Sequence, residues 1–552
     1  MNKLLLLLPL LIFKASFAQS PLTSNYFNYH LVDRSEILNN TLSSEIFTAA
    51  KPYSRKAVNN FNKEAYTLSK VDSFNKAYLL TDNVIFSKKE ATFRNKPILK
   101  NFYDTESAML YIAEPRFNLV VNPVLAFTGG TDKYDSLSLY TNSRGAELRG
   151  NIGNKVGFYS YALENQARFP SYLRDKHNAT GVINGTTLHK NFGQQGEDYF
   201  NVAGYVTFSP IEEIMVQFGH DKNFIGNGYR SLILSDLTAP YPFLKFNTKV
   251  WKLNYTNLYS EHIDFVKQGE SATNGRKFSA LHHLSINVTK NLNIGLFENI
   301  IFDRKDSLES DRYELAYLNP IIFYRALEHG LNSSDNAMLG LDWKWNFKNH
   351  FSFYGQFILD ELVTKEFFGR TNSWVNKQGY QAGLKYVNVA NINNLDLQVE
   401  INQVRPYVYQ HRTRSQNWIH YNQNLAHPLG ANFREILAIV RYQPLDRLNI
   451  TGVFSLSTQG IDSSLTSSNF GGNALRTYYQ IPDRNDAYLV KGVEDKISTF
   501  SLQASYMAWH NLFLDLGFVM RHQENALLNE PLKNSIIHFG LRLNSAAFNY
   551  RQ

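Results

Sequence analysis

The sequence predicts an all-β transmembrane barrel of about 18 antiparallel strands, preceded by a small helical segment. Three observations lead to this prediction. Apolar and polar residues alternate in many runs of about ten residues. The connections between these runs are short and long in turn. Aromatic residues make up 14% of the chain, which suits the aromatic girdles that a barrel places at both membrane interfaces.

The first 18 residues have the pattern of a secretory signal peptide. Lys3 supplies a positive charge, Leu4–Phe13 an apolar run, and Ser16-Phe17-Ala18 a small-x-small cleavage site. The apolar run is about half the roughly 20 residues that a spanning helix needs. No later run is apolar enough for a membrane helix, so a soluble secreted protein and an outer-membrane barrel remain.

Residues 19–116 differ in pattern from the rest of the chain. Within Ser54–Lys70 five apolar residues fall on one helical stripe, namely Ala57, Val58, Phe61, Ala65 and Leu68. Ser54 can cap that helix. The stretches that follow have mixed, short-range patterns. We therefore expect a small, largely helical periplasmic segment here.

From residue 117 to 552 the period of the pattern is two, as a barrel requires. One example is Leu395–Asn402, in which Leu, Leu, Val and Ile alternate with Asp, Gln, Glu and Asn. Met338–Phe347 and Gly379–Tyr386 alternate in the same way. A soluble β-sandwich would produce the same alternation with its apolar face turned inward, so alternation alone leaves that alternative open.

The lengths of the connections favour the barrel. Short links occur at 151–157, 208–214, 288–294, 346–352, 442–448 and 508–514. Long links occur near 166–198, 260–277, 303–335, 361–378, 404–431 and 458–495. Short periplasmic turns facing long extracellular loops are typical of bacterial outer-membrane barrels, and an even strand number returns the C-terminus to the periplasm. We therefore expect the protein in the outer membrane.

One segment, Gly219–Lys245, interrupts the alternation. Gly226 and Gly228 permit positive φ and close approach of the backbone. Ser231–Asp236 can form one strand, and we place a wall strand near 229. Two prolines follow, at 240 and 242, and cannot donate to a strand ladder. The segment is predicted to fold into the mouth or lumen of the barrel.

In that position its polar side chains can hydrogen-bond sugar hydroxyls, and Tyr229 or Tyr241 can stack on a sugar ring. The candidate ligand-binding residues of the segment are Asp221, Asn223, Asn227, Tyr229 and Arg230. A second group is Asp335, Asn336, Asp342 and Lys344, of which the last two face inward by parity. The alternative for both groups is structural, because non-helical backbone at membrane depth needs internal partners and inner walls carry charge networks. Mixed charge along the other inward faces favours a braced lumen over a pore selective for one ion sign.

Other chemistry finds little support. The chain has no Cys, which excludes disulfides and thiolate–metal sites, and its net charge of +8 includes no long basic run that would suit nucleic acid. Motifs of metalloproteases, serine hydrolases and P-loop enzymes do not occur. We therefore expect no cofactor, no metal and no catalysis. A barrel hydrolase built from rim Ser, His and Asp residues is the less favoured alternative.

The order of several stretches resembles the Wzi-type capsule-assembly outer-membrane proteins. These stretches are FNLVVNPVLAFTGG (117–130), the G-x-G segment running into SLILSD, and NPIIFYRALEHGLNSSDNAMLGLDWKW (319–345). The chain is especially similar to the RemB-like gliding-motility proteins of Bacteroidota. The resemblance implies an 18-stranded barrel with a periplasmic helical bundle and an occluded lumen.

The resemblance also implies a function for each branch. In the capsule-assembly branch it implies a lectin that holds polysaccharide at the cell surface. In the gliding branch it implies a surface component that supports motility. The expected partners are outer-membrane lipid, surface polysaccharide, and other envelope or gliding proteins. The main alternative is a passive porin or transport barrel.

Overall fold

The computed structural model describes residues 26–547, apart from 65–66, 88–101, 266–273, 305–310, 322–334, 362–363, 370 and 465–466. The predicted signal peptide lies outside the described residues, as does part of the 319–345 stretch. No helix within the described residues is long and apolar enough to cross a membrane.

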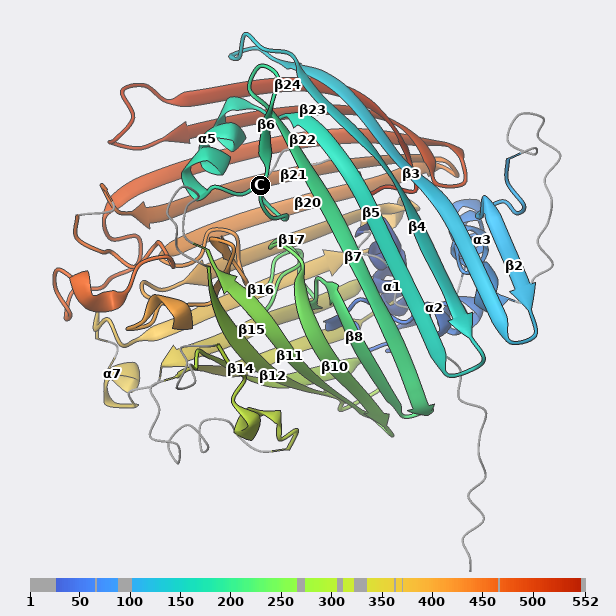
Figure 1. The fold of residues 1–552 in the computed structure, drawn as a ribbon, viewed down its shortest axis with the longest axis horizontal. Helices are drawn as coiled ribbons and strands as arrows, with labels where there is room; N and C mark the ends of the chain where they lie inside the picture. The colour runs from blue at the N-terminus through green and yellow to red at the C-terminus, as the bar shows by residue number, and fades with distance from the viewer. Residues whose placement is uncertain are drawn as a thin grey trace, which may run out of the picture.

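Within the described residues, 18 strands form one closed antiparallel barrel (Figure 1), as the sequence predicts. The ring closes where the last strand pairs with the first, with Leu543 opposite Leu125. In ring order the strands are β3 (Phe117–Asp132), β4 (Leu139–Ile152), β5 (Val156–Arg168), β7 (Gly196–Ile211), β8 (Ile214–Asp221), β10 (Tyr241–Val250), β11 (Leu253–Asp264), β12 (Gly275–Asn287), β13 (Leu292–Phe302), β14 (Asn336–Phe347), β15 (Phe351–Glu361), β16 (Lys377–Tyr386), β17 (Leu395–Val404), β20 (Phe433–Leu445), β21 (Leu448–Ile461), β22 (Val493–Trp509), β23 (Leu512–Glu524) and β24 (Leu532–Leu543).

Shorter elements accompany the ring. β2 (Leu110–Glu114) pairs with β3, and β6 (Lys190–Phe192) pairs with β7. The remaining short strands are β1 (Ala50–Lys51), β9 (Phe224–Ile225), β18 (Ile419–His420) and β19 (Gln423–Asn424). The helices are α1 (Tyr26–Asn39), α2 (Arg55–Glu64), α3 (Lys70–Asp82), α4 (Val84–Ser87), α5 (Ser171–Thr180) and α7 (Thr364–Phe368), with 3-10 turns η2 (Leu315–Leu318), η3 (Val389–Asn391), η4 (Arg414–Gln416) and η5 (Tyr478–Gln480).

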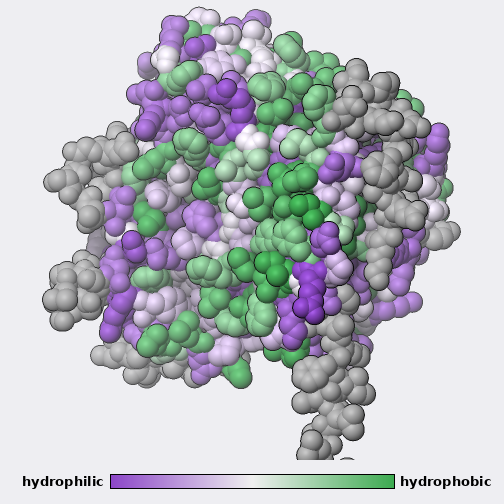
Figure 2. All heavy atoms as spheres, turned by 45° about the vertical axis from the view of Figure 1, so that its right-hand side comes forward, coloured by the Kyte–Doolittle hydropathy of each residue, from purple (hydrophilic) through white to green (hydrophobic). Residues whose placement is uncertain are grey.

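The alternation of the strands sorts their side chains between two environments. In β17, Asp396 and Glu400 are buried inside the barrel, whereas Ile401 is 51% exposed on the outside. Phe200, Phe218 and other apolar side chains are exposed in the same way along their strands. Figure 2 shows hydrophobic residues gathered across the middle of one face of the molecule. This arrangement, apolar outside and polar inside, is that of a membrane barrel and the reverse of a soluble sandwich.

The connections define two different ends. At the short-turn end, tight turns such as the one between Ile152 and Val156 join the strands, at all six positions that the sequence predicts. At the long-loop end, the connections include residues 405–432 and 462–492. In Figure 1 helices α1–α3 lie at the right, at the short-turn end, and α5 and α7 lie at the left, at the long-loop end.

One predicted wall strand is misplaced. The chain leaves the wall after Asp221 and rejoins it only at Tyr241, so the strand expected near 229 does not belong to the ring. Residues 222–240, called the lumen segment below, run inside the barrel instead. Pro242 does lie in a wall strand, opposite His220, but pairing on the other side of β10 begins only at Phe243. A proline is tolerated at the start of a strand, where one side of the strand is still unpaired.

The interior of the barrel contains a large apolar core. Leu232 and Ile233 of the lumen segment pack there against Trp418 and Leu425 of the 405–432 loop and against wall residues such as Ile358. Trp418 donates its indole N–H to the Ile233 carbonyl over 3.0 Å. Each such aliphatic side chain contributes about 1.5–3 kcal/mol through its burial. The lumen is therefore filled by the chain itself.

The N-terminal helices are seated at the short-turn end. Ser54 Oγ accepts the Ala57 N–H over 3.3 Å at the start of α2, and that helix ends at Glu64, before Lys70 begins the next. The Tyr78 hydroxyl in α3 donates to Asn511, in the turn between β22 and β23, over 2.7 Å. The helical segment is thus attached to the turns of the barrel.

Candidate functional site

Inward polar side chains hold the backbone of the lumen segment. Glu400 accepts the N–H groups of Tyr229 over 2.7 Å and of Arg230 over 3.1 Å. Gln381 donates to the Arg230 carbonyl over 3.0 Å. Gln356 accepts the Leu232 N–H over 2.7 Å. Strands β15, β16 and β17 thus supply the partners that the segment loses by leaving the wall ladder.

The two glycines allow this close approach. Gly226 has φ +143°, a backbone conformation that residues with a side chain rarely adopt. At Gly228, a Cβ would lie 2.6 Å from Glu400 Oε2, which is closer than atoms can pack. Larger residues at either position would push the segment away from the wall.

The candidate side chains of the segment have partners within the protein. Arg230 donates to Glu435 of β20 over 3.2 Å. Asn227 Oδ1 accepts from Thr48 over 3.0 Å, and Asn223 Oδ1 accepts from Lys245 over 2.9 Å. Asp221 Oδ1 accepts the backbone N–H of Lys222 over 2.7 Å. Tyr229 is half-buried, and the Arg230 guanidinium lies 5.4 Å from its ring centroid. Tyr241 is fully buried in β10.

The second group of candidates is divided among three places. Asp335 accepts from Arg304 and from the Tyr317 hydroxyl, each over 2.7 Å, and its neighbour Asn336 donates to a carbonyl of the 405–432 loop over 3.0 Å. Asp342 of β14 is paired with His283 of β12 over 2.6 Å, across Gly295 of the intervening strand β13. Lys344 reaches the N-terminal helix instead of a ligand. These four residues do not form one site.

The contact of Lys344 belongs to an ionic network between α1 and the barrel wall. Lys344 Nζ lies 2.6 Å from Glu36 and 3.1 Å from Asp33, while Lys385 Nζ lies 2.6 Å from Asp33. Arg34 of the same helix pairs with Asp396. Burial alone raises the pKa of Asp33, but the two ammonium groups outweigh burial and hold that pKa well below its ordinary value. Sequence parity predicts that the wall residues face inward but does not identify their helical partners.

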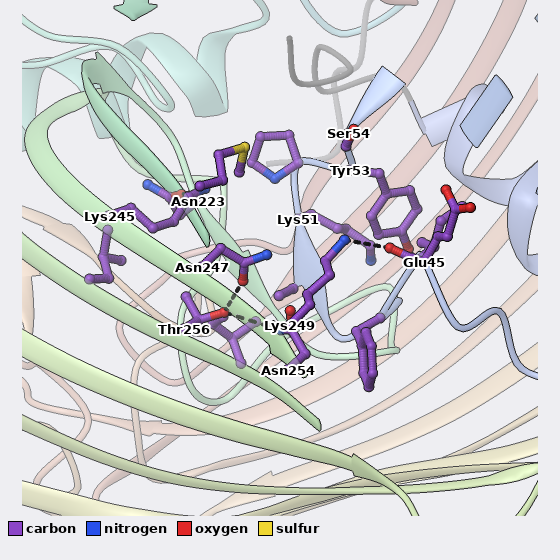
Figure 3. Close-up of a pocket in the computed structure, with 17 residues that line it drawn as sticks. Glu45, Lys51, Tyr53, Ser54, Asn223, Lys245, Asn247, Lys249, Asn254 and Thr256 are labelled. Carbon is purple, nitrogen blue, oxygen red and sulfur yellow. Dashed lines mark hydrogen bonds between the residues drawn. The ribbon is translucent and has the colours of Figure 1, made fainter. Parts of the chain in front are cut away.

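A small cavity lies where residues 45–54 pass the inner faces of β8, β10 and β11 (Figure 3). Its volume is about 40 Å³. Lys249 donates to the Glu45 carbonyl across it, and Thr256 donates to Asn247 over 2.9 Å. A water molecule needs about 10–15 Å³ of such space, so the cavity has room for a few waters and is too small for a sugar ring.

Three aromatic rings gather at the long-loop end, at positions that the sequence patterns do not single out. Trp374 precedes β16, and Tyr478 and Tyr479 come from the 462–492 loop. The ring centroids of Trp374 and Tyr478 are 4.8 Å apart, and those of the two tyrosines are 6.2 Å apart. Tyr479 is 59% exposed, whereas the other two are half-buried. We call these three residues the aromatic platform.

Cationic side chains surround the aromatic platform. The Arg484 guanidinium lies 5.3 Å from the Trp374 ring centroid, and that of Arg412 lies 5.7 Å from the Tyr479 centroid. Lys377 is buried beneath, 4.8 Å from the Tyr478 centroid and 3.2 Å from Glu361. Both arginines are exposed. Their positions suit cation–π attraction while leaving each charge accessible to a ligand.

A family model described as capsule assembly protein Wzi matches residues 142–534 of the chain. The chain belongs to the Wzi capsule-assembly protein family. The match extends from β4 into β24 and therefore takes in nearly all of the barrel wall. None of the curated proteins compared with the chain matches it.

Solved structures agree with this family in fold. A structure from Escherichia coli, described as Wzi, an outer membrane protein involved in group 1 capsule assembly and a carbohydrate-binding β-barrel, is 11% identical with a TM-score of 0.58. The match covers 96% of this chain and 100% of that one. This member of the Wzi family therefore has the fold of an outer-membrane β-barrel.

Two other solved structures match less well. OprD from Pseudomonas aeruginosa is 11% identical with a TM-score of 0.41, over 77% of this chain and 95% of that one. OccAB2 from Acinetobacter baumannii is 9% identical with a TM-score of 0.42, over 77% of this chain and 97% of that one. Neither likeness is close enough to bear on function.

Proposed function

We propose that this protein is a non-catalytic outer-membrane barrel that binds or anchors surface polysaccharide at its long-loop end. In this proposal residues 1–18 are a signal peptide, residues 19–116 form a periplasmic segment, and the loops of the 117–552 barrel face the cell exterior. Membership of the Wzi family supports the polysaccharide class.

The observation that carries the proposal is the filled lumen. The lumen segment and the 405–432 loop pack an apolar core across the interior, and α1 is ion-paired to the wall at the short-turn end. A polymer has no route through such a barrel, so its contacts belong on the outer loops. In this proposal the lumen candidates from Asp221 to Arg230, together with Asp342 and Lys344, have a structural role.

A second form of the proposal concerns motility. The stretches quoted above are especially similar to the RemB-like gliding-motility proteins of Bacteroidota, and a surface polysaccharide anchor can support gliding. The partners would then include other envelope or gliding proteins. The two forms predict different phenotypes for a deletion strain. In the motility form the strain would no longer glide. In the polysaccharide form the strain would no longer hold its surface polysaccharide.

The alternatives make different demands. A transport barrel needs an open lumen, which the apolar core opposes. A hydrolase needs a nucleophile and a base in reach of each other, and the sequence carries none of the common hydrolase motifs. No group of three His, Asp or Glu side chains is placed to hold a metal in the part of the chain that the structure describes.

The test is binding of the detergent-purified, full-length protein to polysaccharide extracted from its own host. The shift in gel mobility on heating verifies that the barrel is folded. Saturable binding by the folded protein is the expected result. A folded protein that binds no host polysaccharide, at any concentration tested, would contradict the proposal.

A further inference from the structure

We propose that the aromatic platform is the subsite that receives the polysaccharide, and that it selects sugars carrying carboxylates. This inference rests on the proposed function and adds both a place and a ligand class. The lumen candidates are buried or half-buried and have partners within the protein, whereas the platform presents an exposed ring with exposed cations beside it.

The rings supply a surface for the apolar face of a sugar. A pyranose ring presents a row of C–H groups on one face, and these are attracted to the negative face of an aromatic ring. Trp374 and Tyr478 are inclined at 52°, and Tyr478 and Tyr479 at 51°, so the three rings do not lie in one plane. Rings in different planes can contact successive units of a twisted polymer.

The charges around the rings favour an anionic polymer. Arg412 and Arg484 are both exposed beside the rings. The sequence of 405–432 contains three Arg and no Asp or Glu. Over the three loops 362–376, 405–432 and 462–492 there are eight Lys and Arg against four Asp and Glu. Arg412 Nε donates to the Tyr479 hydroxyl, which leaves the two terminal nitrogens of that guanidinium, together with the guanidinium of Arg484, for hydrogen bonds to carboxylates.

Nearby acidic groups do not cancel these charges. Glu361 is paired with the buried Lys377 over 3.2 Å. Asp483 is exposed next to Arg484 in sequence, and one of its oxygens accepts the Asn485 N–H over 2.8 Å. Arg412 has no acidic residue in its own loop. Asp486 is paired with Lys491. Among the described residues, no acidic side chain forms an ion pair with Arg412 or Arg484.

The platform is held in place before any ligand arrives. The backbone N–H of Trp374 donates to the backbone carbonyl of Arg484 over 2.9 Å. This hydrogen bond joins the two loops that carry the rings. Arg405 donates to the carbonyls of Asn376 over 2.8 Å and Ala487 over 3.0 Å, which ties the third loop to both. A pre-ordered site loses little conformational entropy when it binds.

The experiment compares polygalacturonate with its fully methyl-esterified form, because the two share a sugar and differ in charge. Variants Tyr479→Ala and Arg484→Gln are tested beside the control Tyr134→Ala. Tyr134 is 56% exposed in the β3–β4 loop, with Lys133 5.7 Å from its ring centroid. It matches Tyr479 in exposure and in its neighbouring cation.

We expect wild type and Tyr134→Ala to bind polygalacturonate equally and the ester at least tenfold more weakly. Tyr479→Ala and Arg484→Gln should each weaken binding to polygalacturonate about tenfold, with heat-modifiability unchanged. Equal binding of polygalacturonate and its methyl ester would contradict the proposal that the site selects carboxylate-bearing sugars. Binding of host polysaccharide but not of polygalacturonate would contradict it as well.

The same variants test whether the aromatic platform is the binding site. Unchanged binding in both Tyr479→Ala and Arg484→Gln overturns the platform as the site while the proposed function stands. A folded wild type that binds neither polygalacturonate nor host polysaccharide overturns the inference and the proposed function together.

Discussion

At the scale of single residues, Glu400 shows how a charge can shape the inside of a barrel. Its carboxylate receives two backbone N–H groups from the lumen segment and the hydroxyl of Tyr354 over 2.8 Å. Parity along Leu395–Asn402 predicts that this side chain faces inward. It does not predict what Glu400 binds, because the two backbone N–H groups come from a segment about 170 positions earlier in the chain.

We expect Glu400→Leu to lower the free energy of unfolding by about 3–5 kcal/mol, because each buried donor left unsatisfied costs about 1–3 kcal/mol. Glu400→Gln keeps an acceptor oxygen and should cost about 1–2 kcal/mol. Denaturant unfolding in detergent, followed by tryptophan fluorescence, measures both. Equal losses in the two variants would show that these hydrogen bonds contribute little.

At the scale of elements, the sequence pattern predicts the wall strands but does not predict the position of the lumen segment. The predicted starts of most wall strands lie within a few residues of the observed ones, because alternation depends only on which face meets lipid. Ser231–Asp236 reads equally well as a wall strand or as a buried apolar stretch. Only the tertiary core around Trp418, formed by a distant loop, decides between the two.

The candidate ligand residues illustrate the same limit. Asp221, Asn227 and Arg230 are polar residues in an irregular segment, a pattern that suits a binding site as well as a self-satisfied plug. The geometry pairs each of them within the protein. The platform residue Tyr479 lies in a long loop without periodicity, where no pattern relates sequence to position.

The attachment of α1 to the wall leads to a prediction about Lys344. Lys344→Met leaves Asp33 and Glu36 buried with fewer partners, and breaking a buried ion pair costs about 3–5 kcal/mol. We expect faster proteolysis of the N-terminal segment while the heat-modifiable barrel persists. Lys252→Met, in the exposed turn after β10, is the control. An unchanged proteolysis rate in Lys344→Met would contradict a role of this ion pair in docking.

The same contact predicts a dependence on pH. The pKa of Asp33 is lower in the folded protein than the value of about 3.9 in an unfolded chain. Its contribution to stability is therefore complete above about pH 5 and decreases as the pH falls below 3.9 toward the folded pKa. Burial raises the pKa of Glu36 in the same contact, so the opposite contribution of that group changes above its unfolded value of about 4.3 and not in this range. Proteolysis of the N-terminal segment with an acid-active protease should accelerate over this range in wild type. The acceleration should be smaller in Lys344→Met, which has already lost part of the contribution.

At the scale of the whole molecule, the barrel is closed in two ways. An apolar core fills the interior, and the N-terminal helices are bound at the short-turn end. We expect the purified protein to produce no stepwise ion conductance in a planar lipid bilayer, under conditions in which a general porin does. Regular conductance steps from a heat-modifiable preparation would instead favour the transport-barrel alternative.

The orientation of the barrel determines whether the aromatic platform can meet a surface polymer at all. The chain has no Cys, so a single introduced Cys is the only thiol. Asp483→Cys lies at the long-loop end and Lys252→Cys in a turn at the short-turn end, and both positions are exposed. A membrane-impermeant maleimide added to intact cells should label Asp483→Cys at once. Lys252→Cys should react only after the outer membrane is permeabilised. The reverse pattern would put the platform in the periplasm, where it could not hold a polymer on the outside of the cell.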